Sequence, residues 1–518
     1  MTMTKSVWVL IAVVALAGGS CNGCDHHPPG GMDLGAIDGD GGGDAAAGDG
    51  GVACVNDGQC ALPATRCCAG VCVEAADCST VVTSVSASVG FQNGGDFVTL
   101  KGAGFASGMK VYLGDGRAPV RVVDPATALI ETPPGPVGPV DVKIVAGAAT
   151  AILPHGFRYR SAGLEMMWQQ KPLMKVRGED PGLAVMQDGR VLVAGGTTVP
   201  DDPTMSLATA EIYDRAADSV SAVPSMMSTP RWHDSAITLL TGKVLVVGGA
   251  CEIGVAGCAS DAQSADLFDP TTNTFTPTAM KLQMPRDYTR AVLMVDGRVF
   301  ISSGNDPSVE IYDPAADSFT LVAHAQLHTY GFVVRLRDGR VLLGGGDGGV
   351  TAAELFDPDT ATFTPAGAMV QGRSMLTAHT LPDGHVAVIG GASMSAGGIV
   401  DPLASIGLFD PTTNTFALAP YQLATPRAWQ ASALVRDGTI LVMGGYTMHA
   451  ACDSSVASVE QIDPVAGKVS AFPSLPNTNT EWTAVTLLDG SVLGVGGGAC
   501  GTTMALPDID FLAGSPIQ

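Results

Sequence analysis

The segment Asp188-Gly-Arg-Val-Leu-Val-Ala-Gly-Gly196 decides the fold, because six close variants of it follow in the chain. Each copy has a turn signal, a short apolar run and glycine near its end, and successive copies begin 42 to 55 residues apart. A period of this length predicts a repeat architecture in which each repeat forms one small antiparallel sheet. The other copies begin at Thr241, Asp296, Asp338, Asp383, Asp437 and Asp489.

Each part of the phrase has its own physical role. Asp-Gly favours a tight hairpin turn with positive φ, Val-Leu-Val is typical of a strand covered on both faces, and the glycine pair fits where backbones crowd. A second phrase follows in most repeats, as in Ala353-Glu-Leu-Phe-Asp-Pro358, and its proline ends a strand. An aromatic residue comes next, which we expect to pack an outer strand between neighbouring sheets: Phe275, Phe319, Phe363, Phe416 and Phe472.

Together these phrases resemble kelch repeats, including those of galactose oxidase-like propellers, over residues 164–512. The resemblance implies an all-β fold with a seven-bladed propeller of four-stranded blades. The last repeat ends without an aromatic outer strand, whereas Leu164–Gln170 precedes the first repeat and carries Trp168. We therefore predict that this segment completes the last blade and closes the ring, which removes exposed sheet edges.

The composition agrees with this fold class and restricts the partners. The 518 residues include 66 Gly and 33 Pro, and the formal net charge is -23. Gly and Pro are costly inside helices, so the chain suits strands and tight turns. An acidic chain repels phosphates, and we therefore expect no nucleic-acid partner.

Residues 1–20 have the pattern of an export signal. Lys5 is followed by the apolar run Val7–Ala17 and by small residues before Cys21. This resembles a bacterial lipoprotein signal, which implies lipidation of Cys21, although Leu16 lies five residues before the cysteine rather than three. The prediction is an outer-membrane or cell-surface lipoprotein, with plain secretion as the alternative and a lipid anchor as the only membrane contact. Residues 21–53, rich in Gly and Asp, are predicted to be a disordered tether.

Residues 54–80 form a cysteine-rich module. Six cysteines in an exported segment with so little core indicate disulfides, and zinc is the competing interpretation. The spacing is similar to that of knottins, and this resemblance implies the pairs Cys54–Cys68, Cys60–Cys72 and Cys67–Cys78. Two further disulfides are predicted in propeller loops, Cys251–Cys258 and Cys452–Cys500.

Residues 82–160 are predicted to be a separate small β-sandwich. Short alternating strands, such as Phe97-Val-Thr-Leu-Lys101 and Pro139-Val-Asp-Val-Lys-Ile-Val145, are separated by turn signals. The segment resembles the immunoglobulin-like IPT/TIG domain, which implies a role as a spacer or binding module.

One position in each repeat, nine residues before the hairpin glycine, is the candidate site. These positions precede the inner strands, so we expect them to ring one mouth of the axial channel, where aromatic faces beside carboxylates suit sugars or peptides. The alternative is that they are variable loop residues that only fill the mouth. We call them the mouth residues: Asp180, His233, Tyr288, Tyr330, Met375, Trp429 and Glu481. Two residues earlier an arginine recurs, for which we predict structural pairing with blade Asp side chains or carbonyls: Arg231, Arg286, Arg373 and Arg427.

These features favour a non-enzymatic binding protein, without a cofactor, for an extracellular carbohydrate or protein. The alternative is a propeller enzyme, either a copper radical oxidase or a carbohydrate-active enzyme. The oxidase chemistry of the resembled family needs two His and two Tyr, one of them cross-linked to Cys, and the mouth residues include only one His. Asp180 and Glu481 belong to neighbouring blades, which keeps paired-carboxylate glycoside hydrolysis open.

Overall fold

The computed structural model describes most of the chain from Thr65 to Gly514, and its described residues belong to one compact unit, Gly51–Gln518. The segments outside the description are 1–64, 69–70, 75–79, 162–163, 173–176, 179, 200–205, 250–261, 303–305, 323–325, 395–399, 448–453, 499–507 and 515–518. The predicted signal, Cys21 and the tether lie in the first of these. In the described part, no helix is long and apolar enough to cross a membrane.

The predicted disulfides also fall largely outside the described residues. Among the described residues no disulfide is seen, but most of the cysteines lie beyond them: Cys54, Cys60, Cys78, Cys251, Cys258, Cys452 and Cys500. The module contributes one hairpin, β1 (Thr65–Cys68) and β2 (Val71–Glu74), in which Cys67 lies opposite Cys72 in the backbone register. The pairings therefore remain predictions.

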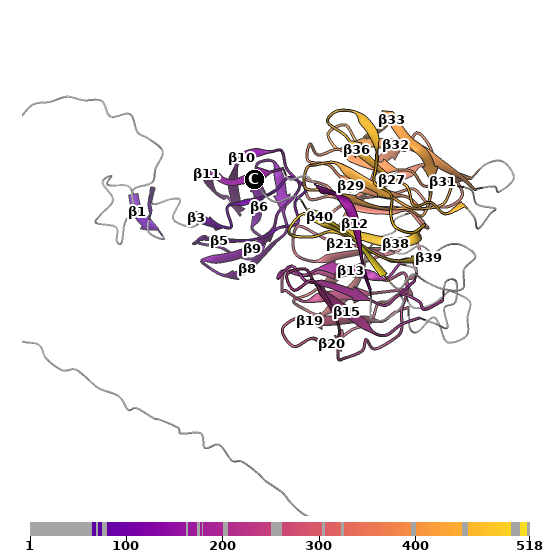
Figure 1. Cartoon of the computed structure of the whole chain (residues 1–518). Coiled ribbons are helices and arrows are strands. Elements are labelled where there is room, and N and C mark those ends of the chain that lie inside the picture. Colours follow the sequence, from indigo (N-terminus) through magenta and orange to yellow (C-terminus); the bar gives the residue numbers. More distant parts are fainter. Residues whose placement is uncertain are drawn as a thin grey trace, which may run out of the picture. The chain divides into compact units, whose positions relative to one another are not determined.

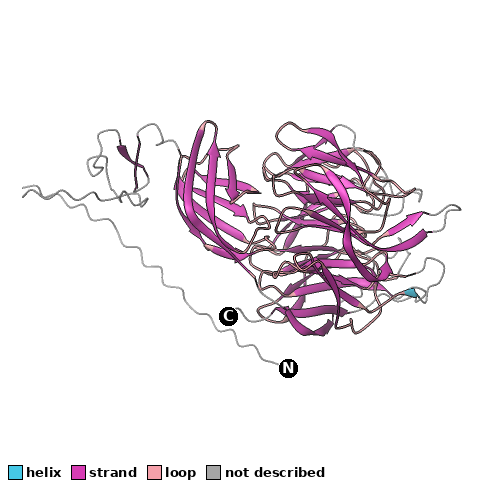
Figure 2. Ribbon diagram, turned by 90° about the horizontal axis from the view of Figure 1, so that it is seen from above, coloured by secondary structure: helices cyan, strands magenta, loops and turns pink. Residues whose placement is uncertain are grey.

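Seven antiparallel sheets make the all-β propeller that the repeats predict (Figures 1 and 2). Consecutive first strands contact one another, and the first contacts the last, so these strands form a closed inner ring. They are β13 (Gly182–Val185), β17 (Ser235–Thr238), β21 (Arg290–Leu293), β25 (Phe332–Arg335), β29 (Thr377–Thr380), β34 (Ala431–Leu434) and β38 (Thr480–Thr486).

The other strands follow in order across each sheet. Second strands are β14 (Val191–Ala194), β18 (Val244–Val247), β22 (Val299–Ser302), β26 (Val341–Gly344), β30 (Val386–Ile389), β35 (Ile440–Met443) and β39 (Val492–Gly498). Third strands are β15 (Ala210–Asp214), β19 (Ala265–Asp269), β23 (Val309–Asp313), β27 (Ala352–Asp357), β32 (Val400–Asp410), β36 (Val459–Asp463) and β40 (Asp508–Gly514). Outer strands are β16 (Ser219–Ala222), β20 (Thr274–Pro277), β24 (Ser318–Val322), β28 (Thr362–Ala368), β33 (Thr415–Arg427), β37 (Lys468–Phe472) and β12 (Leu164–Pro172), and β31 (Ala392–Met394) adds to the fifth sheet.

The repeated phrase occupies the turn and second strand of each blade. Gly189 has a φ of 87°, and the Asp188 carboxylate accepts a hydrogen bond from the Arg190 amide at 3.0 Å, so Asp-Gly closes the hairpin between β13 and β14. All four residues of β14 are buried, as expected for a strand covered on both faces. The spaced aromatic packs on the aromatic of the third strand, as Phe356 and Phe363 show with ring centres 5.0 Å apart.

The last blade takes its outer strand from the start of the array. β12 pairs antiparallel with β40 and lies beside it in Figure 1, as predicted for the segment 164–170. Trp168 packs against a core cluster that includes Phe472 and Trp482, and its indole nitrogen donates to the Pro473 carbonyl at 2.9 Å. The ring is therefore closed by residues from both ends of the repeat array.

Two sheets form the N-terminal sandwich. One contains β3 (Val81–Ser86), β5 (Phe97–Ala103), β9 (Thr127–Glu131) and β8 (Val120–Asp124). The other contains β4 (Val89–Phe91), β11 (Ala149–Arg160), β10 (Gly138–Ala146), β6 (Lys110–Leu113) and β7 (Gly116–Ala118). Ionic contacts join this sandwich to the propeller: the Arg117 guanidinium binds both carboxylate oxygens of Asp359 at 2.9 and 3.0 Å. Arg436 lies over the Phe91 ring and pairs with Asp96 at 3.1 Å.

Candidate functional site

The seven mouth residues occupy equivalent places in the structure. Asp180, His233, Tyr288, Tyr330, Met375 and Trp429 each lie two residues before an inner strand, and Glu481 is the second residue of β38. All seven have positive φ, between 37° and 56°. The seven mouth residues therefore share one backbone position in the blades.

Positive φ is unfavourable for most of these side chains. A left-handed backbone costs a residue other than glycine roughly 1–2 kcal/mol, and Gly or Asn normally takes such positions. At the mouth the chain instead carries large or charged side chains. Strained conformations of this kind cluster at functional sites.

Backbone hydrogen bonds join consecutive mouth residues from blade to blade. The amide of Asp180 donates to the Glu481 carbonyl at 3.0 Å, and the Glu481 amide donates to Trp429 at 3.2 Å. The series continues from Trp429 to Met375 at 3.0 Å and from Met375 to Tyr330 at 2.9 Å. These bonds join five of the seven mouth residues in one series, from Asp180 to Tyr330.

The aromatic mouth residues form one cluster. His233 is stacked between Trp232 and Tyr288, with ring centres 3.9 and 3.8 Å away. Tyr330 meets Tyr288 edge to face at 4.4 Å and Trp429 at 5.4 Å. His233 is buried, whereas Tyr288, Tyr330 and Trp429 are partly exposed and can present ring surface to a ligand.

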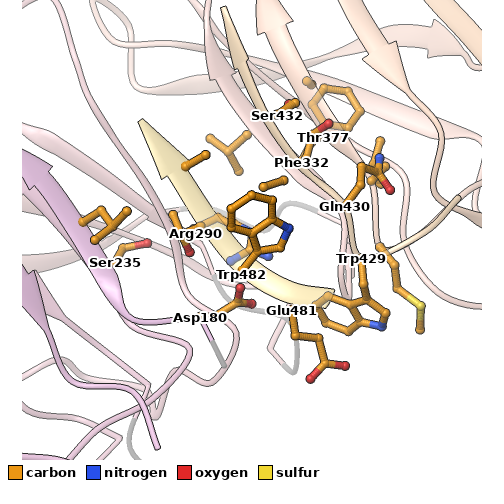
Figure 3. Close-up of a pocket in the computed structure, with 18 of the residues that line it drawn as sticks. Asp180, Ser235, Arg290, Phe332, Thr377, Trp429, Gln430, Ser432, Glu481 and Trp482 are labelled. Atoms are coloured by element: carbon orange, nitrogen blue, oxygen red, sulfur yellow. The ribbon is translucent and has the colours of Figure 1, made fainter. Parts of the chain in front are cut away.

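Below the mouth residues lies a cavity of about 290 Å³ in the axial channel. Four mouth residues line it: Asp180, Met375, Trp429 and Glu481. Figure 3 shows Asp180, Glu481 and Trp429 toward one end of the cavity and Thr377 and Ser432 toward the other. The mouth residues therefore contribute an indole, a thioether and two carboxyl groups to its wall.

Sequence reasoning missed several polar residues of this wall. They lie either one residue after a mouth residue or on the inner strands: Asp234, Arg290, His379, Gln430, Ser432 and Trp482. Counting one residue further along each repeat would have found Asp234, Gln430 and Trp482. The inner-strand residues gave no such signal, because their direction depends on how the blades pack.

Asp234 is the most strongly perturbed acid of the wall. Burial raises the pKa of its carboxyl to about 7, and the nearby Arg231 opposes that shift only in part. Gly182 permits the close approach, because a Cβ there would collide with the Asp234 carboxylate. His379 behaves conversely: burial lowers its imidazole pKa to about 4, and its Nε2 lies 2.6 Å from Ser432 Oγ.

The substitution Asp234→Asn is expected to remove a pH-dependent loss of stability. Between about pH 4 and 7 the folded protein holds a proton on Asp234 that the unfolded chain has lost, so this group makes stability fall as pH rises, by up to about 1.4 kcal/mol per pH unit. The difference in stability between the variant and the wild type should therefore shift in favour of the variant as the pH rises from 5 to 8. Thermal melts of both proteins at the two pH values measure this gain, and an equal difference at both values would contradict it.

Buried arginines hold the loops that carry the mouth residues. Arg427 donates to the Gly444 and Ser458 carbonyls, each at 2.9 Å, and pairs with Glu460 at 2.7 Å. Arg177, Arg231 and Arg286 make equivalent carboxylate pairs with Glu211, Asp266 and Glu310. The carbonyl contacts were predicted, but the carboxylate is mostly the Glu of the second phrase rather than an Asp.

The described mouth residues do not fit the copper site of the oxidase alternative. The one His among them, His233, is stacked on Tyr288, and the rings of Tyr288 and Tyr330 meet edge to face with centres 4.4 Å apart. Among the described residues no group of three or more His, Cys, Asp or Glu could hold a metal ion. The two tyrosines and the histidine thus pack on one another rather than converge on a vacant point.

Comparisons with known proteins give one family match and similar solved structures. Residues 80–159 match the model of the IPT/TIG domain. A fungal alcohol oxidase of the AA5 family, solved in complex with copper, covers 67% of this chain and 76% of its own, with 17% identity and a TM-score of 0.54. The structure of YjhT covers 58% of this chain and 99% of its own, with 15% identity and a TM-score of 0.43. At these identities the oxidase likeness establishes the propeller fold and nothing about activity.

Proposed function

We propose that this chain is a non-enzymatic binding protein and that its propeller mouth takes a carbohydrate. The observation that carries the proposal is the set of seven large or charged side chains at positive φ around one opening. Glycine would relieve that strain at each position, so the presence of large or charged side chains there supports a role for them in binding.

The chemistry of the opening suits a sugar. Partly exposed rings of Tyr288, Tyr330 and Trp429 offer flat apolar surface, and Asp180 and Glu481 provide carboxylate acceptors beside it. Ligand sites commonly combine aromatic walls with a few placed polar groups. The cavity below has the volume for part of a sugar rather than for a folded protein segment.

Trp429→Ala is expected to weaken carbohydrate binding by roughly tenfold or more, because it removes the largest ring of the opening. A tenfold change corresponds to a loss of about 1.4 kcal/mol of binding free energy. Glycan and peptide arrays with wild type, Trp429→Ala and Tyr330→Ala measure the effect. Tyr112→Ala, which changes a sandwich tyrosine under Lys143, is the matched control and should bind like wild type. Unchanged binding by both mouth variants would exclude this opening, and a peptide-only signal would reject the sugar.

The proposal includes export. Lys5, the apolar run Val7–Ala17 and Cys21 support a surface lipoprotein, and the acidic net charge of -23 argues against nucleic acid as a partner. A propeller displayed beyond a Gly/Asp-rich tether would meet extracellular glycans. Metabolic labelling with a fatty acid, compared between wild type and Cys21→Ser, tests the anchor.

A further inference from the structure

The fifth blade lacks the carboxylate that pairs with the buried arginine in four other blades. Gly407 stands in β32 at the position that Glu460 occupies in β36. Arg373 is nevertheless buried, with 1% of its surface exposed. It donates to the carbonyls of Gly390 and Ser405 at 3.0 and 2.9 Å and to Ser405 Oγ at 2.9 Å, all neutral acceptors.

In two of these blades the carboxylate also accepts hydrogen bonds from two backbone amides. Glu460 receives hydrogen bonds from the amides of Ala424 and Thr425 at 2.6 and 3.1 Å, besides Arg427. Glu310 receives those of Gln283 and Met284 at 2.8 and 3.1 Å, besides Arg286. In these two blades the carboxylate thus fills a nest of two amides and one guanidinium, an arrangement that favours an anion.

The residues at the equivalent positions of the fifth blade line a small cavity. Val370 and Gln371 stand three and two residues before Arg373, as Ala424 and Thr425 stand before Arg427. Both line a cavity of about 10 Å³ together with Arg373 and Gly407. The Gln371 side-chain oxygen accepts from Ser405 Oγ at 2.8 Å and so supplies a dipole but no charge. A space of this size is at the lower limit for one water-sized occupant.

We propose that this cavity binds one monatomic anion of halide size, which takes the place of the missing carboxylate. A buried cation without a counter-charge is costly, and a halide beside Arg373 would offset that cost. The site is lined by residues of β30, β32 and β33 and of the segment before β29, and none of the mouth residues lines it. Its function is to stabilise the loop that carries Met375.

The test compares wild type with Gly407→Glu, which restores the carboxylate. A Cβ added at Gly407 would lie 3.7 Å from the Val388 side chain, which is an ordinary van der Waals contact. The first atom of a glutamate side chain therefore fits at this position. We expect the melting temperature of wild type to rise saturably by roughly 2–4 °C on titration with chloride or bromide at constant ionic strength, with sulfate as the balancing ion. Gly407→Glu should melt higher without halide and should not respond to it.

Two further measurements keep the result decisive. Crystals soaked in bromide should show an anomalous peak beside Arg373 in wild type and none in Gly407→Glu. Glu460→Gly, which makes the same hole in the sixth blade, should acquire a halide response. Equal responses of wild type and Gly407→Glu, or no peak beside Arg373, would overturn the proposal and leave water as the occupant.

Discussion

A protein in which β12 (Leu164–Pro172) is replaced by a Gly/Ser segment of equal length is expected to lose roughly 10 °C or more in melting temperature and to aggregate. β12 is the outer strand of the last sheet, and its Trp168 packs in the core beside Phe472 and Trp482. Without it β40 becomes an open sheet edge, which is a template for association. Calorimetry and size-exclusion chromatography measure the two effects.

The matched control replaces β16 (Ser219–Ala222), the outer strand of the first blade, in the same way. That change also exposes an edge, on β15, but it removes no link between the start and the end of the array. A similar loss of stability in both variants would mean that β12 contributes as any outer strand does. A much larger loss on β12 replacement would identify ring closure as its particular role.

The blade pattern could be predicted from sequence because its physical causes are local. Asp188-Gly189 closes a turn between neighbours in the chain, and the buried run of β14 follows directly. The mouth residues could be located by counting, since the same register repeats in every blade. The closing strand could also be predicted, because Trp168 supplies the aromatic residue that the last repeat lacks.

The rest depends on side chains that meet across long stretches of chain. Arg427 and Glu460 are separated by 33 residues, and although the Glu recurs in the repeats, nothing local shows that it faces an arginine. The absence of a carboxylate at Gly407 has meaning only once that pairing is known. Likewise Asp234 looks like an ordinary loop acid until the inner ring of strands buries it.

Arg427→Met is expected to lower the free energy of unfolding by about 3–5 kcal/mol, since it leaves the Glu460 carboxylate buried without its cation. Both side chains are almost fully buried, with 0% and 6% of their surfaces exposed. The double variant Arg427→Met, Glu460→Leu should recover part of this loss, because it leaves no unpaired buried charge. The recovery is incomplete because the amides of Ala424 and Thr425 and the carbonyls that Arg427 bound lose their partners. Chemical denaturation of the four proteins of this cycle gives the coupling energy.

The exposed pair Arg340–Asp338 is the control for charge removal as such. Its atoms are as close, at 2.7 Å, but 25% and 46% of the two side chains are exposed. Arg340→Met should therefore change stability by only about 0–1 kcal/mol. If the two losses were equal, or if the losses from Arg427→Met and Glu460→Leu simply added, the buried pair would not hold the mouth loop. A large coupling confined to the buried pair would show that Arg427 and Glu460 stabilise the fold as a unit beneath the loop that carries Trp429.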